Sequence, residues 1–217
     1  MKQYCILSDF DGTITKKDGL YAFIEQYAKE GWEKIEQDWV SGKIDSKTCL
    51  IEEFKLVPNL SEELISDFID KLEIDETFID FYNNMFQKTD FYIVSDGIDY
   101  FIKRILQKYE LDGINIISNH GEFRGEFFEI TFPNDSEKCI NNAGTCKCCV
   151  LSDLRKEYEK IIYIGDGVSD YCVADKADIL YAKKRLLNYC DDKGIKCIPY
   201  DSFMDINISD CIRTYDM

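Results

Sequence analysis

The chain has 217 residues, 45% of them hydrophobic, and its 42 acidic residues outnumber 26 basic ones to give a formal net charge of −16 at pH 7. That length and hydrophobic content predict one globular domain with room for a small insertion. The negative charge argues against nucleic acid or an anionic membrane surface as a partner. Residues 1–7 carry too short an apolar run for a signal peptide, and no later stretch approaches a membrane span. We therefore expect a cytoplasmic protein whose ten cysteines are mostly reduced.

The apolar pattern predicts strands and helices that alternate along the chain. A strand over 4–8 is followed by a helical stretch over about 19–88, with helices at 20–28, 32–40, 46–56 and 61–72. The later segments are strand 91–94, helix 100–109, strands 114–118 and 126–132, helix 150–160, strands 161–164 and 178–182, helix 184–192 and strand 196–200. This alternation indicates an α/β fold with a doubly wound, Rossmann-like parallel sheet and a site beyond the carboxyl ends of its strands.

Two aspartates come directly after the first strand. Asp9 and Asp11 are two residues apart, so on an extended segment both carboxylates point into one cleft. Like charges at that separation cannot ionise independently, and their pKa values are driven apart. One carboxylate can then act as a nucleophile while the other holds a proton for a leaving group. Gly12 and Thr13 add a turn whose backbone N–H groups can approach an anion, and a hydroxyl donor. A structural Asp-Gly turn is the alternative interpretation of this segment.

Three further motifs stand where strands or helices are expected to begin or end. Strand 91–94 runs into Ser95-Asp96-Gly97, and strand 161–164 runs into Gly165-Asp166-Gly167-Val168-Ser169-Asp170. Lys147 precedes a helical stretch, with an ordinary solvated lysine as the alternative. Asp170 either faces the same site as Asp166 or only stabilises the start of a helix.

With these residues in this order, nearly the whole chain resembles the haloacid dehalogenase superfamily of aspartate-nucleophile phosphatases. The resemblance implies that Asp9 is the nucleophile, which forms an aspartyl-phosphate. It also implies that Asp11 protonates the leaving oxygen and later activates water, and that Lys147 neutralises charge between nucleophile and phosphoryl group. The residues implied to bind phosphate are Thr13, Ser95, Asp96 and Gly97.

The same resemblance implies Mg²⁺ as cofactor and a small phosphorylated metabolite as substrate. The expected ligands of Mg²⁺ are Asp9, Asp11 and Asp166, with Asp170 and Asp18 in supporting positions. The chemistry requires such a set, because hydrolysis of a phosphomonoester demands that roughly 20 kcal/mol be removed from the barrier. A carboxylate that approaches a phosphate dianion is repelled, and a hard divalent cation with a lysine offsets that repulsion.

The helical stretch after the first motif resembles the cap of the phosphoserine-phosphatase-like branch. We therefore expect residues 1–14 and 89–217 to form the catalytic core and residues 15–88 to form a helical cap that excludes water. Asp18 is either a substrate contact or part of a plain Asp-Gly turn. Four aromatic residues are expected to form the core of the cap rather than a binding surface: Trp32, Trp39, Phe54 and Phe68.

Several segments resemble one family within this branch, the 2-hydroxy-3-keto-5-methylthiopentenyl-1-phosphate phosphatases of methionine salvage. They are the opening Asp-Phe-Asp-Gly-Thr-Ile-Thr, the run from Phe132-Pro133 through a cysteine-bearing linker to Cys146-Lys147, Asn119-His120, and residues 186–200. The chain departs from those relatives in having one glycine after Ser95-Asp96 and in Cys148, where they tend to have proline. Phosphoserine and other small metabolite phosphates are the alternative substrates.

The cysteines form one local cluster, at Cys139, Cys146, Cys148 and Cys149. Their spacing lacks the pair separated by two residues that is usual in zinc ribbons, so we expect unligated thiols rather than structural zinc. His120 is the only histidine in the chain, which leaves no histidine-rich metal site to build and favours a structural role for it.

Two other classes of protein compete with a phosphatase. A phospho-accepting receiver module of a signalling pathway also uses an aspartate, an acidic pair, a hydroxyl and a lysine on a parallel sheet. It would be shorter than this chain and would lack both the cap and an acid at the position of Asp11. An inactive phosphate-binding protein would lack a catalytic residue, whereas the catalytic set of this chain is complete.

Overall fold

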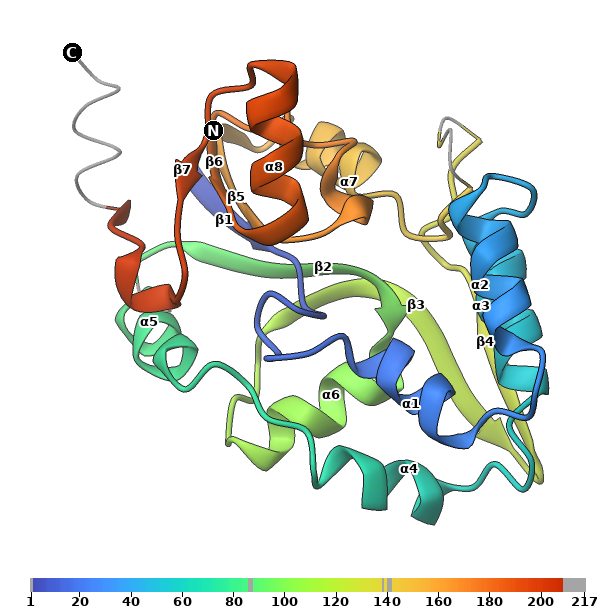
Figure 1. Cartoon of the computed structure of the whole chain (residues 1–217). Helices are drawn as coiled ribbons and strands as arrows, with labels where there is room; N and C mark the ends of the chain where they lie inside the picture. Colours follow the sequence, from blue (N-terminus) through green and yellow to red (C-terminus); the bar gives the residue numbers. More distant parts are fainter. Residues whose placement is uncertain (1, 86–87, 138, 140–141, 209–217) are drawn as a thin grey trace.

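The computed structural model describes residues 2–85, 88–137, 139 and 142–208 (Figure 1). At its centre lies a seven-stranded sheet in the order β4-β3-β2-β1-β5-β6-β7. Neighbouring strands pair in parallel, except for β3 and β4, which form an antiparallel hairpin. The strands are β1 (Lys2–Ser8), β2 (Asp90–Ile98), β3 (Asn115–Arg124), β4 (Phe127–Thr131), β5 (Tyr158–Gly165), β6 (Ile179–Ala182) and β7 (Ile198–Pro199). The predicted α/β fold with a mostly parallel sheet is therefore confirmed.

Helices cover both faces of this sheet. Helices α7 and α8 lie on one side of the strands and α6 lies on the other (Figure 1). The core divides in the same way, because Cys5 and Leu7 of β1 pack with the α7 and α8 side chains while Ile6 packs with those of α5 and α6. A central parallel strand buried on both faces needs an uninterrupted apolar run, which explains the opening of the chain. The helices are α1 (Gly19–Tyr27), α2 (Trp32–Val40), α3 (Ser46–Lys55), α4 (Glu62–Ile69), α5 (Thr77–Met85), α6 (Asp99–Lys108), α7 (Lys147–Leu154) and α8 (Lys184–Lys193).

Helices α1 to α4 occupy the stretch predicted as a cap. Their aromatic rings continue the packing of the sheet layer, because the Phe23 ring centroid lies 5.1 Å from that of Phe101 in α6. Phe54 and Phe68 join the same group, which confirms that they are core residues, and Trp32 is also buried. Trp39 is half-buried instead, and its indole Nε1 donates a hydrogen bond to Ser46 Oγ at 2.9 Å.

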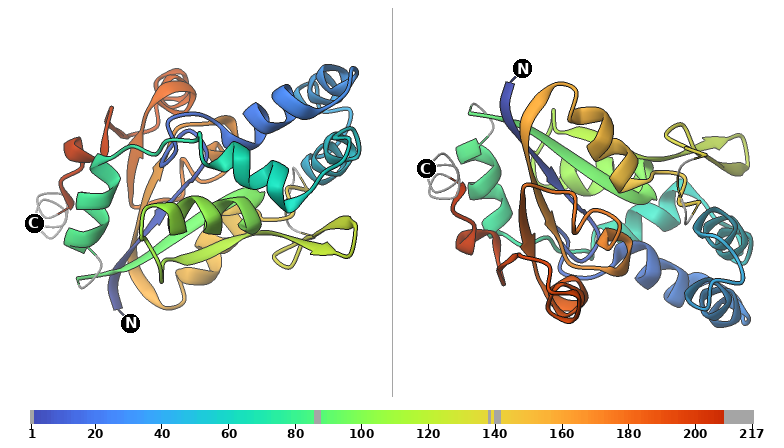
Figure 2. Two further views of the ribbon diagram at one scale, coloured as in Figure 1. Left: turned by 90° about the horizontal axis from the view of Figure 1, so that it is seen from below. Right: turned by 90° about the horizontal axis from the view of Figure 1, so that it is seen from above.

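Helix α5 packs differently from the four helices before it. The Phe78 ring lies 5.8 Å from that of Phe91 in β2 and 4.9 Å from that of Phe203, in the short 3-10 helix η2 (Phe203–Asp205). Figure 2 shows α5 beside η2, at the opposite end of the molecule from α2 and α3. The expected division into cap and core stays a prediction. Phe86 and Gln87, near the expected end of the cap at residue 88, lie outside the described residues.

One predicted helix has the wrong bounds. The pattern over 150–160 indicated a helix, but α7 begins at Lys147 and ends at Leu154, and β5 begins at Tyr158. Tyr158 pairs with Lys2 of β1, and its hydroxyl donates to Asp90 at 2.7 Å. These contacts with distant residues override the local helical preference. Within the described part of the chain, no helix has the length and apolarity needed to cross a bilayer.

A pair of glutamates, the half-buried Glu36 of α2 and the buried Glu53 of α3, predicts a pH dependence of stability. Burial, with the Glu36 carboxylate as second cause, raises the pKa of Glu53 from 4.5 to about 7. The folded chain then binds this proton more tightly than the unfolded chain, so Glu53 lowers stability as pH rises from 4.5 to 7. We expect Glu53→Gln to remove a decline on the order of 2 kcal/mol in the free energy of unfolding over that interval.

Urea unfolding of wild type and Glu53→Gln at matched pH values checks this expectation. Other carboxyl groups with raised pKa values, such as Asp11, contribute a slope of the same sign, so the difference between the two proteins is the informative quantity. A constant difference across the interval would contradict the expectation.

Candidate active site

The predicted site residues gather at one edge of the sheet. Asp9 follows the end of β1 and Asp166 follows the end of β5, and Ser95 lies near the end of β2. The Asp9 N–H donates to the Ile164 carbonyl at 2.9 Å, which holds the end of β1 against β5. Because these strands are parallel, their carboxyl ends bring side chains from distant parts of the sequence together.

Lys147 lies at the centre of this group. Its Nζ is 2.7 Å from Asp9 Oδ1, 2.7 Å from Asp170 Oδ1 and 2.8 Å from Ser169 Oγ. Only 2% of the residue is exposed. Burial alone would lower the pKa of Lys147, but the carboxylates of Asp170 and Asp9 raise it well above its ordinary value. The lysine is therefore charged, and the alternative of a solvated surface lysine is wrong.

Three carboxylates surround the position that a cation would take. One oxygen each from Asp9, Asp166 and Asp170 lies within 4.8 Å of the others, and all three residues are buried. Burial and the nearby Asp170 raise the pKa of Asp9 well above its usual range, and Lys147 only partly opposes them. A bound cation would favour the ionised form of these carboxylates. Buried hard oxygen donors fit a divalent cation such as Mg²⁺.

Asp170 organises the loop that carries Asp166. One of its oxygens accepts hydrogen bonds from the N–H groups of Asp166 at 2.9 Å and Gly167 at 3.0 Å. The other accepts from Tyr163 Oη at 2.6 Å and from Lys147 Nζ. Asp170 ends the 3-10 helix η1 (Val168–Asp170), and its side chain accepts from the N–H of the N-cap residue Gly167. Its position therefore agrees with both interpretations of the sequence: it stabilises a helix start and it faces the site.

Asp11 lies beside the carboxylate group but is not one of its members. Its Oδ1 accepts a hydrogen bond from the Gly19 N–H at 2.8 Å. Burial, followed by the negative charge of Asp18, raises the pKa of Asp11 to about 8. A carboxyl group with that pKa holds a proton near neutral pH and can donate it. A role for Asp11 as a metal ligand stays a prediction.

The turn after Asp11 packs directly against Asp166. Gly12 has φ +76°, and a Cβ at this position would lie 2.6 Å from Asp166 Oδ2. Only glycine combines this backbone conformation with so close an approach. Thr13 Oγ1 donates to Asp166 Oδ1 at 3.1 Å, so the hydroxyl expected to contact phosphate bonds to Asp166 in this structure.

The other expected phosphate contacts are consecutive residues near the end of β2, where the register with β3 shifts. Ser95 Oγ accepts from the Gly97 N–H at 2.9 Å. The Asp96 carboxylate lies 3.9 Å from Lys147 Nζ, and Asn119 Nδ2 donates to the Asp96 carbonyl at 2.6 Å. The Asn119 side chain thereby links this end of β2 to β3.

Asp18 and His120 have structural partners. The Asp18 carboxylate accepts from the Tyr21 N–H at 3.0 Å and caps α1, which agrees with the turn interpretation; its role toward substrate stays a prediction. His120 Nδ1 lies 2.9 Å from Asp99 Oδ2 at the start of α6. This contact agrees with the structural role expected of the histidine.

Two lysines at the site were missed in the sequence. Lys184 Nζ donates to Asp166 Oδ2 at 2.9 Å and to the Gly12 carbonyl at 2.6 Å. Lys183 Nζ donates to the Thr13 carbonyl at 3.1 Å. Both lysines directly follow β6, and the rule that sites form beyond the carboxyl ends of parallel strands is the signal that could have found them.

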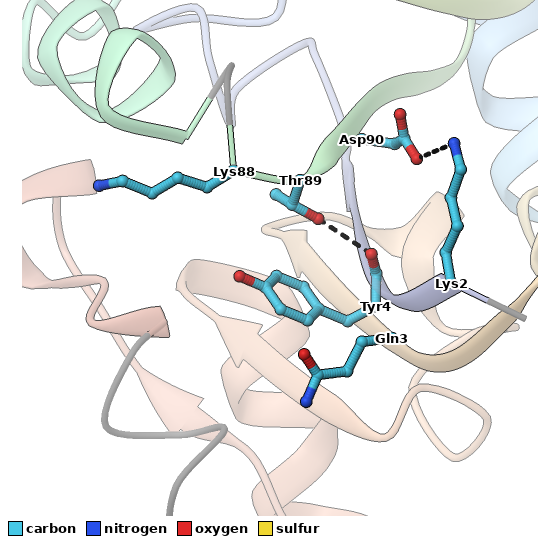
Figure 3. A pocket seen from close by; sticks show the side chains of 6 residues that line it. All are labelled: Lys2, Gln3, Tyr4, Lys88, Thr89 and Asp90. Atoms are coloured by element: carbon cyan, nitrogen blue, oxygen red, sulfur yellow. Dashed lines mark hydrogen bonds and ion pairs between the residues drawn. The ribbon is translucent and has the colours of Figure 1, made fainter.

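A separate pocket lies at the opposite edge of the sheet. Figure 3 shows its lining residues, among them Lys2 and Asp90, whose side chains form an ion pair of 2.6 Å. The Thr89 hydroxyl donates to the Tyr4 carbonyl there at 2.9 Å. These residues belong to the amino ends of β1 and β2, so this pocket is remote from Asp9 and Lys147 and forms no part of the candidate site.

Comparison with known sequences adds independent information. Residues 4–186 match the model of a family described as Putative Phosphatase. The chain is 33% identical to a 2-hydroxy-3-keto-5-methylthiopentenyl-1-phosphate phosphatase of Bacillus pumilus, over 95% of this chain and 90% of that protein. A protein of the same name from Exiguobacterium sibiricum is also 33% identical, over 93% of each chain.

Solved structures share the fold. A substrate-bound phosphoserine phosphatase complex superposes with a TM-score of 0.68 at 21% identity, and the match covers 95% of this chain and 97% of that one. A haloacid dehalogenase family hydrolase from Salmonella enterica gives a TM-score of 0.71 at 22% identity, covering 93% of this chain and 69% of that one. At these identities the likeness establishes the fold.

Proposed function

The chain belongs to the putative phosphatase family, a haloacid dehalogenase family of phosphoric monoester hydrolases, and on that premise we propose that it is a Mg²⁺-dependent phosphomonoesterase with Asp9 as its nucleophile. One observation carries this proposal. The buried Asp9 carboxylate is held 2.7 Å from the charged Lys147, at the sheet edge where Asp166 and Asp170 also lie. This carboxylate is shielded from solvent and paired inside the protein, which suits a nucleophile better than a surface ion pair.

The reaction proceeds in two steps on this set of residues. An Asp9 oxygen attacks phosphorus, the bond from phosphorus to the leaving oxygen breaks, and Asp11 gives that oxygen its proton. Asp11 then takes a proton from a water molecule, which attacks the aspartyl-phosphate and releases inorganic phosphate and the Asp9 carboxylate. The pKa of about 8 suits Asp11 to the first transfer. Lys147 offsets the repulsion between nucleophile and phosphate.

Asp9 and Asp166 would hold the metal, with Asp170 fixing the loop that carries Asp166. When bound, Mg²⁺ supplies positive charge that stabilises the phosphoryl oxygens during transfer. Thr13 and Lys184, which bond to the two oxygens of Asp166, orient that carboxylate. The segment of Ser95, Asp96 and Gly97 near the end of β2 supplies donors for the phosphoryl group.

Asp166→Ala is expected to weaken magnesium activation. The variant loses a carboxylate ligand, so the Mg²⁺ concentration for half-maximal activity should rise about 10- to 100-fold, with partial recovery of turnover at high Mg²⁺. Magnesium titrations of phosphatase activity measure this shift. Asp175→Ala removes an exposed carboxylate nearby and serves as the control. An unchanged magnesium dependence in Asp166→Ala would remove this residue from the metal site.

We also propose that helices of residues 15–88 form a cap over a core of residues 1–14 and 89–217. Asp9 is only 4% exposed and Lys147 2% exposed, so the protein must open before substrate can reach these side chains. Leu20 of α1 and Leu72 after α4 approach the site, because a Cβ at Gly97 would lie 3.3 Å from Leu20 Cδ1 and one at Gly19 would lie 3.3 Å from Leu72 Cδ1. Both glycines adjoin Asp11, the proposed proton donor.

These leucines favour an apolar leaving group. We propose 2-hydroxy-3-keto-5-methylthiopentenyl-1-phosphate as substrate, in keeping with the names of the relatives. Phosphoserine is the competitor, and its carboxylate calls for an arginine, which is absent from the sequence before Arg104. The specificity constant for the enol-phosphate should exceed that for phosphoserine by about 100-fold. Steady-state kinetics with both substrates measure this ratio. A higher specificity constant for phosphoserine would refute the proposed substrate and leave the phosphatase assignment intact.

A further inference from the structure

Four thiols that the proposed reaction does not use converge at the start of α7. The Cys146 Sγ lies 3.3 Å from the Cys148 Sγ, and the sulfurs of Cys146, Cys148 and Cys149 all lie within 4.8 Å of one another. The Cys139 side chain reaches the Cys146 thiol from the linker between β4 and α7. The sequence spacing favoured unligated thiols because it does not show that the linker folds back to bring Cys139 to the helix.

We propose that Cys139, Cys146, Cys148 and Cys149 bind one Zn²⁺ ion as a structural tetrathiolate site. Zinc takes four sulfur donors in closed structural sites. Here three sulfurs lie within 4.8 Å of one another, and the Cys139 side chain lies against that of Cys146. The site differs in kind from the carboxylate site, because sulfur is a soft donor and Mg²⁺ prefers oxygen.

The linker that carries Cys139 is tied to the inserted helices as well. Lys47 of α3 forms an ion pair of 2.6 Å with Asp135, and Asn142 Nδ2 donates to Asp45 Oδ2 at 2.6 Å. A zinc ion would fasten the other side of this linker to α7. The helix start that it would brace contains Lys147, between Cys146 and Cys148. The zinc site would therefore help to hold together the inserted helices, the linker between β4 and α7, and the start of α7 that carries Lys147.

Metal analysis of the full chain tests the site. Protein purified with a phosphine reductant, supplied with Zn²⁺ and then freed of loosely bound metal, should retain about one zinc per chain. Exchange of Co²⁺ into the protein should produce sulfur-to-cobalt charge-transfer bands and the visible bands of a tetrahedral thiolate site. Carboxylate-bound cobalt lacks the sulfur bands, so the spectrum separates this site from that of Asp9 and Asp166.

Variants locate the metal. Cys146→Ser and the half-buried Cys149→Ser should each lower zinc retention at least about 10-fold and weaken the cobalt charge-transfer bands. Cys197→Ser, a half-buried thiol beyond α8, is the matched control and should retain both signals. Circular dichroism establishes that each variant is folded.

Any one of the following results would overturn the proposal. The first is wild-type protein that retains no zinc and shows no thiolate bands with Co²⁺, a result that needs no variant. The second is zinc retention in both serine variants equal to that of Cys197→Ser. The third is iron with a visible chromophore in place of zinc, or a disulfide between Cys146 and Cys148 that survives the reductant. None of these results bears on the phosphatase assignment.

Discussion

Asp9→Asn is expected to lower kcat at least about 10⁴-fold while the fold is retained, because an amide cannot form the aspartyl-phosphate. Asparagine has nearly the shape of aspartate, and its side-chain oxygen can still accept from Lys147, 2.7 Å away in the wild type. Steady-state assays at saturating Mg²⁺ measure the loss, and thermal unfolding followed by circular dichroism measures the fold. Asp175→Asn, with an exposed side chain, is the control for handling and purification.

Residual activity of Asp9→Asn needs one check, since a trace of wild-type enzyme mimics a weakly active variant. Mass spectrometry of the purified variant excludes reversion of the amide to the acid. If the intact variant keeps more than about one per cent of wild-type turnover, Asp9 is not the nucleophile.

Lys147→Met is expected to combine a loss of activity with a loss of stability. The lysine bonds to Asp9 and Asp170 inside the protein, and its removal leaves both carboxylates without their shared cation. Breaking a buried ion pair from one side should lower the free energy of unfolding by on the order of 3 kcal/mol. Turnover should fall about 10³-fold because nucleophile and phosphate then repel each other. Urea unfolding in the presence of a metal chelator isolates the effect on the fold.

A double-mutant cycle separates the ion pair from simple packing. Asp170→Asn alone removes the charge on the other side, and Lys147→Met/Asp170→Asn removes both charges. The double variant should be more stable than the sum of the single losses predicts, because it leaves fewer buried charges unpaired. Strict additivity of the three values would show that Lys147 and Asp170 do not interact energetically.

Local patterns predict much of this site because the chemistry lies where strands end. The apolar runs before Asp9 and Asp166 indicate strands buried on both faces, and parallel strands bring their carboxyl ends to one edge. The carboxylates of Asp9 and Asp166 could therefore be expected near one another from the sequence. Lys147 was expected beside them from the family resemblance. Their geometry in the structure agrees with that expectation for Asp9, Lys147, Asp166 and Asp170.

Features that depend on contacts between distant segments could not be predicted from local sequence patterns alone. The two lysines after β6 also follow a strand end, but their contacts with Asp166 and the Gly12–Thr13 turn depend on β5 and β6 lying side by side, which the local pattern does not give. Helix α7 ends early because Tyr158 pairs with Lys2, more than a hundred residues away in the chain. The aromatic rings of the insertion pack on α6 rather than only on each other, and no periodicity within the insertion carries that information.

The central claim, a phosphoryl group carried by Asp9, is tested most directly by acid-quench labelling. Asp11→Asn should accumulate phosphoenzyme when mixed with Mg²⁺ and a radiolabelled aryl phosphate, since an aryl leaving group needs no proton but hydrolysis of the acyl phosphate needs a base. We predict radiolabel on the peptide that contains Asp9 in this variant, and no radiolabel in Asp9→Asn. Absence of acid-stable label from both wild type and Asp11→Asn during turnover, or label on another residue, would contradict it.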